Sequence, residues 1–288
     1  MSHGENHMLN EYKAHVDERA NQNIPPLPLD ADQTSQLVDL LKAEHEESEL
    51  LLHLLKERVP AGVDQAAYVK AAFLSDITTG KADSPYVSKV DAVKILGTML
   101  GGYNIQPLIE CLKIDGLGSD AADALSKTLL IFDAFNEIFE LSQSNEHAKK
   151  VIDSWAEGTW FTEKSEIPEQ IKLTVYKVPG EINTDDLSPA TDAWSRPDIP
   201  LHALAMFKMP REGIERPLET IDELKEKGNP LVFVGDVVGT GSSRKSATNS
   251  VLWHMGDEIP CIPNKKEGGF CFGGKIAPIF FNTLEDSG

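Results

Sequence analysis

The stretch from residue 231 to residue 253 constrains the fold most, because it predicts a strand, a tight turn and a helix in direct succession. A short apolar run, Leu231–Val234, is bounded by Pro230 and Gly235 and is typical of a buried strand. Residues 246–253 contain neither proline nor glycine, so they can continue as a helix. This half of the chain is therefore predicted to belong to the α/β class.

The turn between strand and helix carries groups suited to a small polyanion. Three glycines allow positive φ angles and a close approach of the backbone to a ligand. Ser242 and Ser243 offer hydroxyl groups, Arg244 offers a planar fork for a carboxylate, and the helix start offers free N–H groups. The three glycines are Gly235, Gly239 and Gly241.

Two nucleotide-binding motifs come close to this turn without matching it. A P-loop requires glycine directly before its lysine and serine, but Arg244 precedes Lys245 and Ser246 here. The dinucleotide fingerprint also requires a glycine where Arg244 stands. Nucleotide binding is therefore disfavoured, and a turn that merely connects strand and helix is the plain structural alternative.

Length and composition favour a two-domain protein with a sizeable core. The 288 residues allow two domains of about 150 residues each, and the apolar content of 41% excludes global disorder. The net charge of −19 repels nucleic acid and anionic lipid in general. No apolar run approaches the roughly 18 residues of a spanning helix, and the start lacks a signal segment. We therefore expect a cytoplasmic protein with no membrane partner.

The cysteines and histidines show no metal-binding spacing. Cys111, Cys261 and Cys271 are odd in number and far apart, which argues against a disulfide framework and predicts buried thiols. The eight histidines contain no H-E-x-x-H motif. We predict no metal site formed by this chain alone.

The N-terminal half, residues 8–165, has helical periodicity throughout. Asp30 stands three residues before Gln33 in a capping-box pattern, and Asp64 and Ser88 are expected to begin two further helices. Short helices between Pro/Gly turns predict stacked antiparallel pairs, hence a helical solenoid, with an irregular bundle as the alternative. Later helices are predicted over residues 119–132 and 147–155.

Beyond Ile167 and Pro168 the pattern changes, and residues 168–288 are predicted to form the α/β domain. Residues 172–178 alternate as a strand, and residues 220–227 have the pattern of a helix. Residues 275–281 are predicted to form another strand.

A second polar cluster spans residues 183–202. Asp185 and Asp186 are adjacent, so on a strand they would face opposite sides, and turn capping is the simpler interpretation of each. Arg196 precedes Pro197, which favours an extended backbone at Arg196. For that arginine, a solvated surface position is the simpler interpretation.

Together the two clusters resemble a known family. TDDLSPATDAWSR at residues 184–196 and GDVVGTGSSRKSATNSVLW at residues 235–253 look like the two signature stretches of the aconitase swivel domain. A helical half placed before that domain resembles the bacterial aconitase B family, over the chain from Met8 to its last residue. The resemblance implies a HEAT-like helical solenoid followed by a β/β/α swivel domain that is truncated at its C-terminal side.

The resemblance also implies a hydro-lyase. The family interconverts citrate and isocitrate through cis-aconitate in the tricarboxylic acid cycle, and it also acts on 2-methylisocitrate. Ser242 matches the family's serine base, and Arg244 and Arg196 match arginines that bind substrate carboxylates. Ser243 lies in the same substrate-binding motif, and Asp185 matches a supporting aspartate of the active site.

The family's 4Fe–4S cluster is held by cysteines in domains that follow the swivel domain, and the cysteines of this chain match none of its motifs. The chain is therefore expected to be inactive alone and to need downstream cluster-bearing domains. The resemblance further implies a possible homodimer through the helical domain and messenger RNA as a possible partner of the cluster-free state.

The residues agree with the implied role of Ser242. A serine hydroxyl is a poor base in water and needs donors and positive charge placed beforehand around its alkoxide. The helix start and Arg244 supply such a field. Two other functions stay open: a helical protein-interaction or dimerisation module with a swivel domain, and a small subunit like that of isopropylmalate isomerase, against which the helical half argues.

Overall fold

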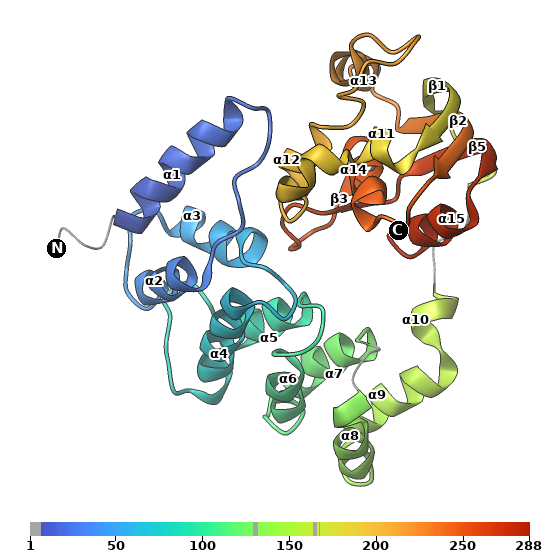
Figure 1. The fold of residues 1–288 in the computed structure, drawn as a ribbon. Coiled ribbons are helices and arrows are strands. Elements are labelled where there is room, and N and C mark those ends of the chain that lie inside the picture. The colour runs from blue at the N-terminus through green and yellow to red at the C-terminus, as the bar shows by residue number, and fades with distance from the viewer. Residues whose placement is uncertain (1–6, 129–131, 164–165, 167) are drawn as a thin grey trace. The chain divides into compact units, whose positions relative to one another are not determined.

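The chain divides into two compact units, which we call the helical unit and the α/β unit (Figure 1). This computed structural model describes residues 7–128, 132–163, 166 and 168–288. The helical unit comprises the described residues of Met1–Ala14, Pro28–Ile167 and Pro260–Pro263. The α/β unit comprises His15–Leu27, Pro168–Ile259 and Asn264–Gly288. Each unit therefore contains a short segment that is remote in sequence from the rest of it.

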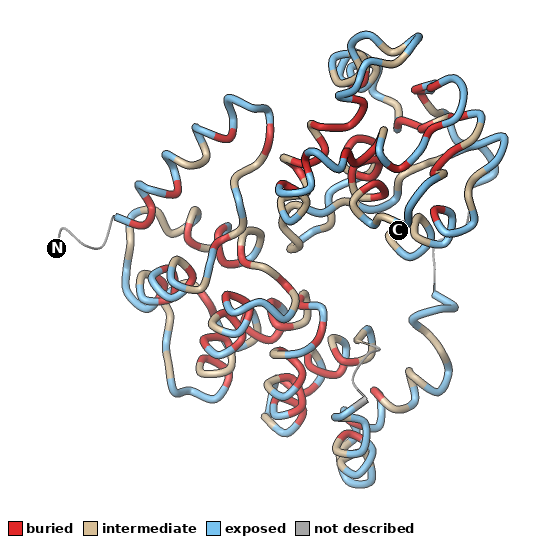
Figure 2. Tube along the Cα trace, in the orientation of Figure 1, coloured by how far each residue is buried: buried red, intermediate tan, exposed pale blue. Residues whose placement is uncertain are grey.

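The described part of residues 8–163 is helical, as the sequence predicts. Its helices are α1 (His7–Ala20), α2 (Ala31–Leu41), α3 (Ser48–His53), the π-helical turn η1 (Leu54–Arg58), α4 (Gln65–Thr79), α5 (Lys89–Gly97), α6 (Ile105–Cys111), α7 (Gly118–Ser126), the 3₁₀ turn η2 (Phe132–Ala134), α8 (Phe135–Ser142), α9 (Glu146–Glu157) and α10 (Thr159–Thr162). Helices close in sequence pack on one another, with α2 on α4, α4 on α5, α5 on α7, and α7 on α9. Figure 2 shows the buried residues of these helices in red. They are mainly leucine, isoleucine, valine and alanine.

The predicted helix starts are confirmed by their hydrogen bonds. Asp30 and Gln33 form the capping box, in which the Asp30 carboxylate accepts the Gln33 N–H at 2.8 Å. Asp64 accepts the Ala66 N–H at 2.8 Å, and Ser88 accepts an N–H in the first turn of α5. Each side chain satisfies a donor that the first helical turn leaves without a partner.

Two expectations for the helical half need correction. The helix predicted over residues 119–132 ends at Ser126 as α7, and residues 129–131 lie outside the described part of the chain. The sequence analysis also misses α8. Its apolar residues have helical spacing, since Phe135, Ile138 and Phe139 lie on one face of the helix; of these three, Ile138 is fully buried and the two phenylalanines are exposed.

The α/β unit is built on a parallel sheet with the strand order β1-β2-β5. The strands are β1 (Thr174–Asn183), β2 (Leu231–Thr240) and β5 (Phe270–Ile276), and a small antiparallel pair consists of β3 (Asp257–Glu258) and β4 (Lys266–Glu267). The helices are α11 (Thr184–Leu187), the 3₁₀ turn η3 (Ala190–Ser195), α12 (Ile199–Ala203), α13 (Pro217–Lys225), α14 (Lys245–Met255) and α15 (Pro278–Glu285). The predicted α/β class is confirmed at this level.

The strand predicted over residues 275–281 is wrong. Strand β5 ends at Ile276, and Pro278 begins α15. Proline at the first helical position lacks only an N–H that the helix would leave unbonded, and its fixed φ suits the helix. The apolar run that follows therefore forms a helix, and Phe280 is buried in the core of the α/β unit.

Strand β2 is longer than predicted, because it continues through Gly235 to Thr240. Gly235 does not have the positive φ that the sequence analysis allowed for it. Glycine is required at this position because a Cβ would lie 2.5 Å from Val238 Cγ2 and 2.7 Å from Ile182 Cδ1. Gly239 and Gly241 do have positive φ, at 79° and 93°.

The core of the α/β unit contains a cluster of three aromatic rings. Phe207 and Phe233 are stacked with ring centroids 6.3 Å apart, and Tyr176 lies 6.1 Å from Phe233. Around them pack apolar residues of β1, β2 and α14. This core fixes the strands from which the candidate site is built.

The segment His15–Leu27 is held in the α/β unit by the ion pair between the buried Arg19 and the partly buried Asp198. Both terminal nitrogens of Arg19 donate to the Asp198 carboxylate, at 2.6 and 2.9 Å, and Arg19 Nε donates to the Pro25 carbonyl at 2.9 Å. Asp198 also caps α12 by accepting the Leu201 N–H. Bidentate pairs of this kind fix the relative position of the two groups.

None of the helices in the described ranges has the length and apolar character that a transmembrane span requires.

Candidate functional site

The candidate site lies where two neighbouring parallel strands end. Asn183 at the end of β1 is paired with Thr240 at the end of β2, and each strand leads into a helix. The carboxyl ends of parallel strands are where α/β proteins commonly bind ligands. The two polar clusters of the sequence are thereby brought together: Thr184 Oγ1 donates to the Ser242 carbonyl at 2.9 Å.

A capping box orients the two adjacent aspartates differently. The Asn183 side chain accepts the N–H groups of Asp185 and Asp186 at 2.7 and 3.0 Å, and the Asp186 carboxylate accepts the Asn183 N–H at 2.9 Å. Asp186 also accepts from Arg211 Nη1 at 3.1 Å. The capping interpretation is thus confirmed for Asp186. The Asp185 carboxylate binds Arg244 and also interacts with the backbone N–H of Ala190.

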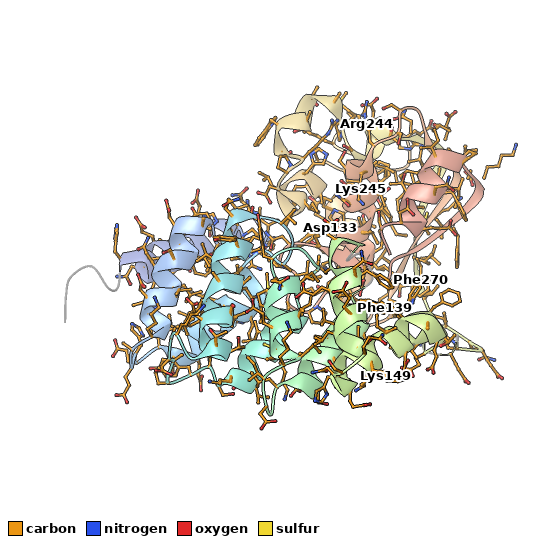
Figure 3. The ribbon with its side chains drawn as sticks, turned by 90° about the horizontal axis from the view of Figure 1, so that it is seen from below. Asp133, Phe139, Lys149, Arg244, Lys245 and Phe270 are labelled. Atoms are coloured by element: carbon orange, nitrogen blue, oxygen red, sulfur yellow. The ribbon has the colours of Figure 1, made fainter. Side chains whose placement is uncertain are left out.

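Arg244 is the centre of the hydrogen bonds at the site. Its Nη1 donates to the Asp185 carboxylate and, at 3.0 Å, to the Ser188 carbonyl. Both bonds leave from this one nitrogen, so the other guanidinium edge has no protein partner within the described residues. The hydrogen bond from Arg244 lowers the pKa of Asp185, so that carboxyl group is ionised at neutral pH. Arg244 and Lys245 lie at the start of α14 (Figure 3).

Ser242 and Ser243 are exposed on the loop before α14. Gly239 permits this loop to pass over the Phe280 ring, since a Cβ there would lie 2.1 Å from Phe280 Cγ. At Gly241 a Cβ would lie 3.2 Å from Thr184 Oγ1. The positive φ angles and the missing side chains therefore bring the loop into close contact with its support.

The loop borders a small pocket of about 110 Å³. Its lining includes Thr184, Gly239, Gly241, Ser242, Ser243, Arg244, Ala277, Pro278, Ile279, Phe280 and Thr283. Since a water molecule occupies roughly 30 Å³, this pocket has room for one carboxylate end of a ligand and a little water. The walls combine hydroxyl groups and one guanidinium with the apolar start of α15.

The N-terminus of α14 adds partial positive charge to the same place. Arg244 is its N-cap residue with an extended backbone, and no side chain caps the helix. Helices leave their first N–H groups unsatisfied, and these groups attract anions. The hydroxyl groups of the loop therefore stand beside a helix end that has no capping carboxylate or hydroxyl of its own.

Arg196 differs from its expected conformation. Its φ and ψ are −54° and −34°, so the backbone is helical at the end of η3 and not extended, although Pro197 follows. The side chain is half-buried, and its Nε is buried without a hydrogen-bond partner in the described structure. The simple solvated-surface interpretation is therefore wrong. The positive charge of Arg196 contributes to lowering the pKa of Asp185, after that of Arg244, which places the two arginines in one electrostatic neighbourhood.

Sequence reasoning misses a buried polar chain behind the site. The Ser188 hydroxyl is 2.7 Å from the Ser246 hydroxyl and 2.8 Å from His202 Nε2. On the other side of the ring, His202 Nδ1 is 2.8 Å from the Ser195 hydroxyl, which donates to the Asp192 carbonyl at 2.8 Å. The sequence signal for this hydrogen-bonded group is that its serines and His202 all fall within the two polar clusters.

The described residues do not fit an iron–sulfur cluster. They contain no group of three or more His, Cys, Asp or Glu side chains that could hold a metal. Cys111 is buried within the helical unit, and Cys271 belongs to β5 of the α/β unit. Iron–sulfur clusters are ligated by several thiolates at one place, whereas these two thiols belong to separate units.

The geometry defines a class of protein. A helical unit is joined to a parallel α/β unit whose strand ends present serine hydroxyls, an arginine and a helix N-terminus, which are groups of the kind that attract anions. Residues 11–161 match the family model described as the aconitate B N-terminal domain, and residues 173–288 match that described as the aconitate hydratase 2 N-terminus. The chain belongs to the aconitate hydratase B family, of which it represents the N-terminal domains.

Curated relatives agree with this assignment. The chain is similar to aconitate hydratase B of Synechocystis, with 62% identity over 98% of this chain and 32% of the relative. It is 60% identical to aconitate hydratase B of Pseudomonas aeruginosa and 59% identical to that of Escherichia coli, over 98% of this chain and 33% and 34% of those proteins. The chain thus spans about a third of the length of the curated relatives it matches.

Proposed function

We propose that this chain is the N-terminal part of an aconitate hydratase and supplies the proton-abstracting serine and the carboxylate-binding arginines of the active site. The reaction is the interconversion of citrate and isocitrate through cis-aconitate in the tricarboxylic acid cycle, together with dehydration of 2-methylisocitrate. The observation that carries the proposal is the joint presentation of Ser242 and Arg244 at the pocket beside the N-terminus of α14.

Ser242 is proposed to act as the base. Its alkoxide oxygen takes the proton from a substrate carbon, the C–H electron pair remains on the substrate, and the serine returns to its hydroxyl form. An alkoxide in water is too costly to be useful, so its charge must be stabilised before the reaction. The unsatisfied N–H groups of α14 and the Arg244 guanidinium provide that stabilisation.

The arginines are proposed to bind substrate carboxylates. Asp185 and the Ser188 carbonyl hold Arg244 through Nη1, which leaves the other edge of its fork for a carboxylate. Asp185 is therefore a supporting residue, because it orients the guanidinium. Arg196 supplies a second cation, and its buried Nε has no hydrogen-bond partner among the described residues. Ser243, exposed next to Ser242, is proposed as a further substrate contact.

The finer architecture is also a proposal. We propose a HEAT-like helical domain over residues 8–165 and an aconitase swivel domain over residues 168–288. Consecutive packing of α2, α4, α5, α7 and α9 supports the first, and the parallel sheet with its terminal loop site supports the second.

The remaining expectations concern other parts of the enzyme. We propose that downstream domains hold the 4Fe–4S cluster, that the enzyme works in the cytoplasm, and that the helical domain contributes to a homodimer. Binding of messenger RNA in the cluster-free state is proposed from the family resemblance alone.

The test begins with the 288-residue chain and tricarballylate, a tricarboxylate that resembles citrate. Calorimetry should detect weak saturable binding, and Arg244→Lys should weaken it because a point charge replaces a bidentate fork. The matched control is Arg216→Lys, which changes an exposed arginine of the same unit that pairs with the exposed Glu223. Arg216→Lys should leave the dissociation constant unchanged.

In the full-length enzyme, Ser242→Ala should abolish turnover and spare citrate binding. A near-normal kcat in Ser242→Ala would rule out this serine as the base. Unchanged citrate affinity in Arg244→Lys would refute the clamp. Oligomerisation of the chain without any tricarboxylate binding would favour the interaction module instead.

A further inference from the structure

The buried polar chain behind the site has a single consistent direction of hydrogen bonding. Ser195 uses its only hydroxyl hydrogen on the Asp192 carbonyl, so its oxygen must accept a hydrogen from His202 Nδ1. A neutral imidazole has one N–H, so Nε2 accepts from the Ser188 hydroxyl, and the Ser188 oxygen accepts from the Ser246 hydroxyl. Each of these hydroxyl groups and both ring nitrogens then have a hydrogen-bond partner.

The neutral form of His202 is favoured by its surroundings. The residue is 2% exposed. Burial, and next the positive charge of Arg196, lower the pKa of the His202 imidazole below its ordinary value of 6.5. His202 thus remains neutral at pH 7, and its two ring nitrogens act as one donor and one acceptor.

The two serines bound by His202 belong to the two segments that carry the arginines. The Ser188 carbonyl accepts from Arg244 Nη1 at 3.0 Å. Ser195 directly precedes Arg196 in the chain, at the end of η3. The imidazole ring therefore connects the support of Arg244 with the backbone that presents Arg196, and Ser246 extends the connection into the first turn of α14.

We propose that His202 is a positioning residue that sets the separation of the two carboxylate clamps, Arg196 and Arg244. This inference rests on the function proposed above for the two arginines. The ring touches neither arginine's proposed ligand; it acts through Ser188 on one side and Ser195 on the other. A rigid ring with two fixed bonds holds a distance that two flexible side chains could not hold alone.

We call the two hydrogen bonds of His202, to Ser188 and to Ser195, the brace. Two substitutions of His202 each remove one of these bonds. The amide of asparagine reaches the place of Nδ1, so His202→Asn keeps the bond to Ser195 and loses that to Ser188. The longer glutamine reaches the place of Nε2, so His202→Gln keeps the bond to Ser188 and loses that to Ser195. The matched control is His254→Gln, because His254 is also buried and, among the described residues, its Nε2 bonds to the Ala203 carbonyl at 3.0 Å.

The first readout is the side-chain NMR signal of each arginine Nε–H in the 288-residue chain without ligand, assigned by Arg196→Lys and Arg244→Lys. His202→Gln should shift the Arg196 signal, His202→Asn should shift the Arg244 signal, and His254→Gln should shift neither. The second readout is tricarballylate affinity, which should fall about tenfold in each His202 variant, equivalent to about 1.4 kcal/mol and to the loss of one hydrogen bond.

The outcomes separate this inference from the proposed function. If wild-type chain binds no tricarballylate, the proposed function fails, while the NMR shifts still test the brace. If binding depends on Arg244 but folded His202 variants leave both arginine signals unchanged, the brace alone is refuted. If the His202 variants do not fold, Ser195→Ala and Ser188→Ala each remove one hydroxyl. Ser195→Ala must then shift Arg196, and Ser188→Ala must shift Arg244, or the inference is wrong.

Discussion

Replacing Gly239 by alanine should destabilise the protein more than the same change at Gly228 or Gly62, because it combines two separate costs. The φ of 79° is unfavourable for a residue with a Cβ, by about 1–2 kcal/mol. The new Cβ would also lie 2.1 Å from Phe280 Cγ and 2.4 Å from Phe280 Cβ, at the root of a buried ring that cannot swing aside. Overpacking of this kind costs about 1–3 kcal/mol, so the total is about 2–5 kcal/mol.

Two other glycines separate these costs. Gly228 has φ 75° and nothing within 4 Å of an added Cβ, so Gly228→Ala should show the backbone cost alone, about 1–2 kcal/mol. Gly62 has neither a positive φ nor a near neighbour, so Gly62→Ala should be neutral or stabilise by about 0.4–1 kcal/mol.

Urea denaturation of the three variants measures the free energies of unfolding, and hydrogen exchange of residues 231–240 and 278–285 locates the loss in the α/β unit. The reasoning fails if Gly239→Ala costs no more than Gly228→Ala. It also fails if exchange in these two segments is unchanged in Gly239→Ala.

Two further predictions concern charge. Arg19→Ala leaves the Asp198 carboxylate, whose side chain is only 15% exposed, without its partner and should cost about 3 kcal/mol in urea denaturation. Lys149→Ala breaks an exposed pair and should have no measurable effect; equal effects of the two changes would contradict this. Burial lowers the pKa of His254 from 6.5 to about 4, so between these values the unfolded chain binds more protons and stability falls as the pH falls. From pH 7 to 4, wild type should therefore lose about 3 kcal/mol more than His254→Gln, and parallel pH profiles of unfolding would be the contrary result.

Local sequence patterns predict the features that depend only on residues close together in the sequence. The caps at Asp30, Asp64 and Ser88 form as expected, because each needs only a side chain and an N–H two or three residues away. The helix α15 was mistaken for a strand because Ile279 to Phe281 is a short apolar run, and such runs do not distinguish the two structures. The position of Pro278 was the usable signal.

The candidate site was predicted only in its parts. The glycine-serine turn and Arg244 predict an anion site by their chemistry. The contact between Asp185 and Arg244 cannot be predicted from sequence spacing, because the two residues are 59 positions apart. That contact follows from the parallel pairing of β1 with β2, which is a property of the tertiary fold. The two hydrogen bonds of His202 are not predictable from the sequence for the same reason, because the partner serines lie 14 and 7 residues away on separate turns.

The segment His15–Leu27 has a consequence for the order in which the protein is made. Arg19 leaves the ribosome 179 residues ahead of Asp198, the residue that neutralises it. At about 5–20 residues per second, this arginine waits roughly 10–35 s during synthesis before its partner exists. The N-terminal segment must therefore stay accessible while residues 28–167 of the helical unit emerge, and the α/β unit reaches its native pairing by binding a part of the chain that was translated first.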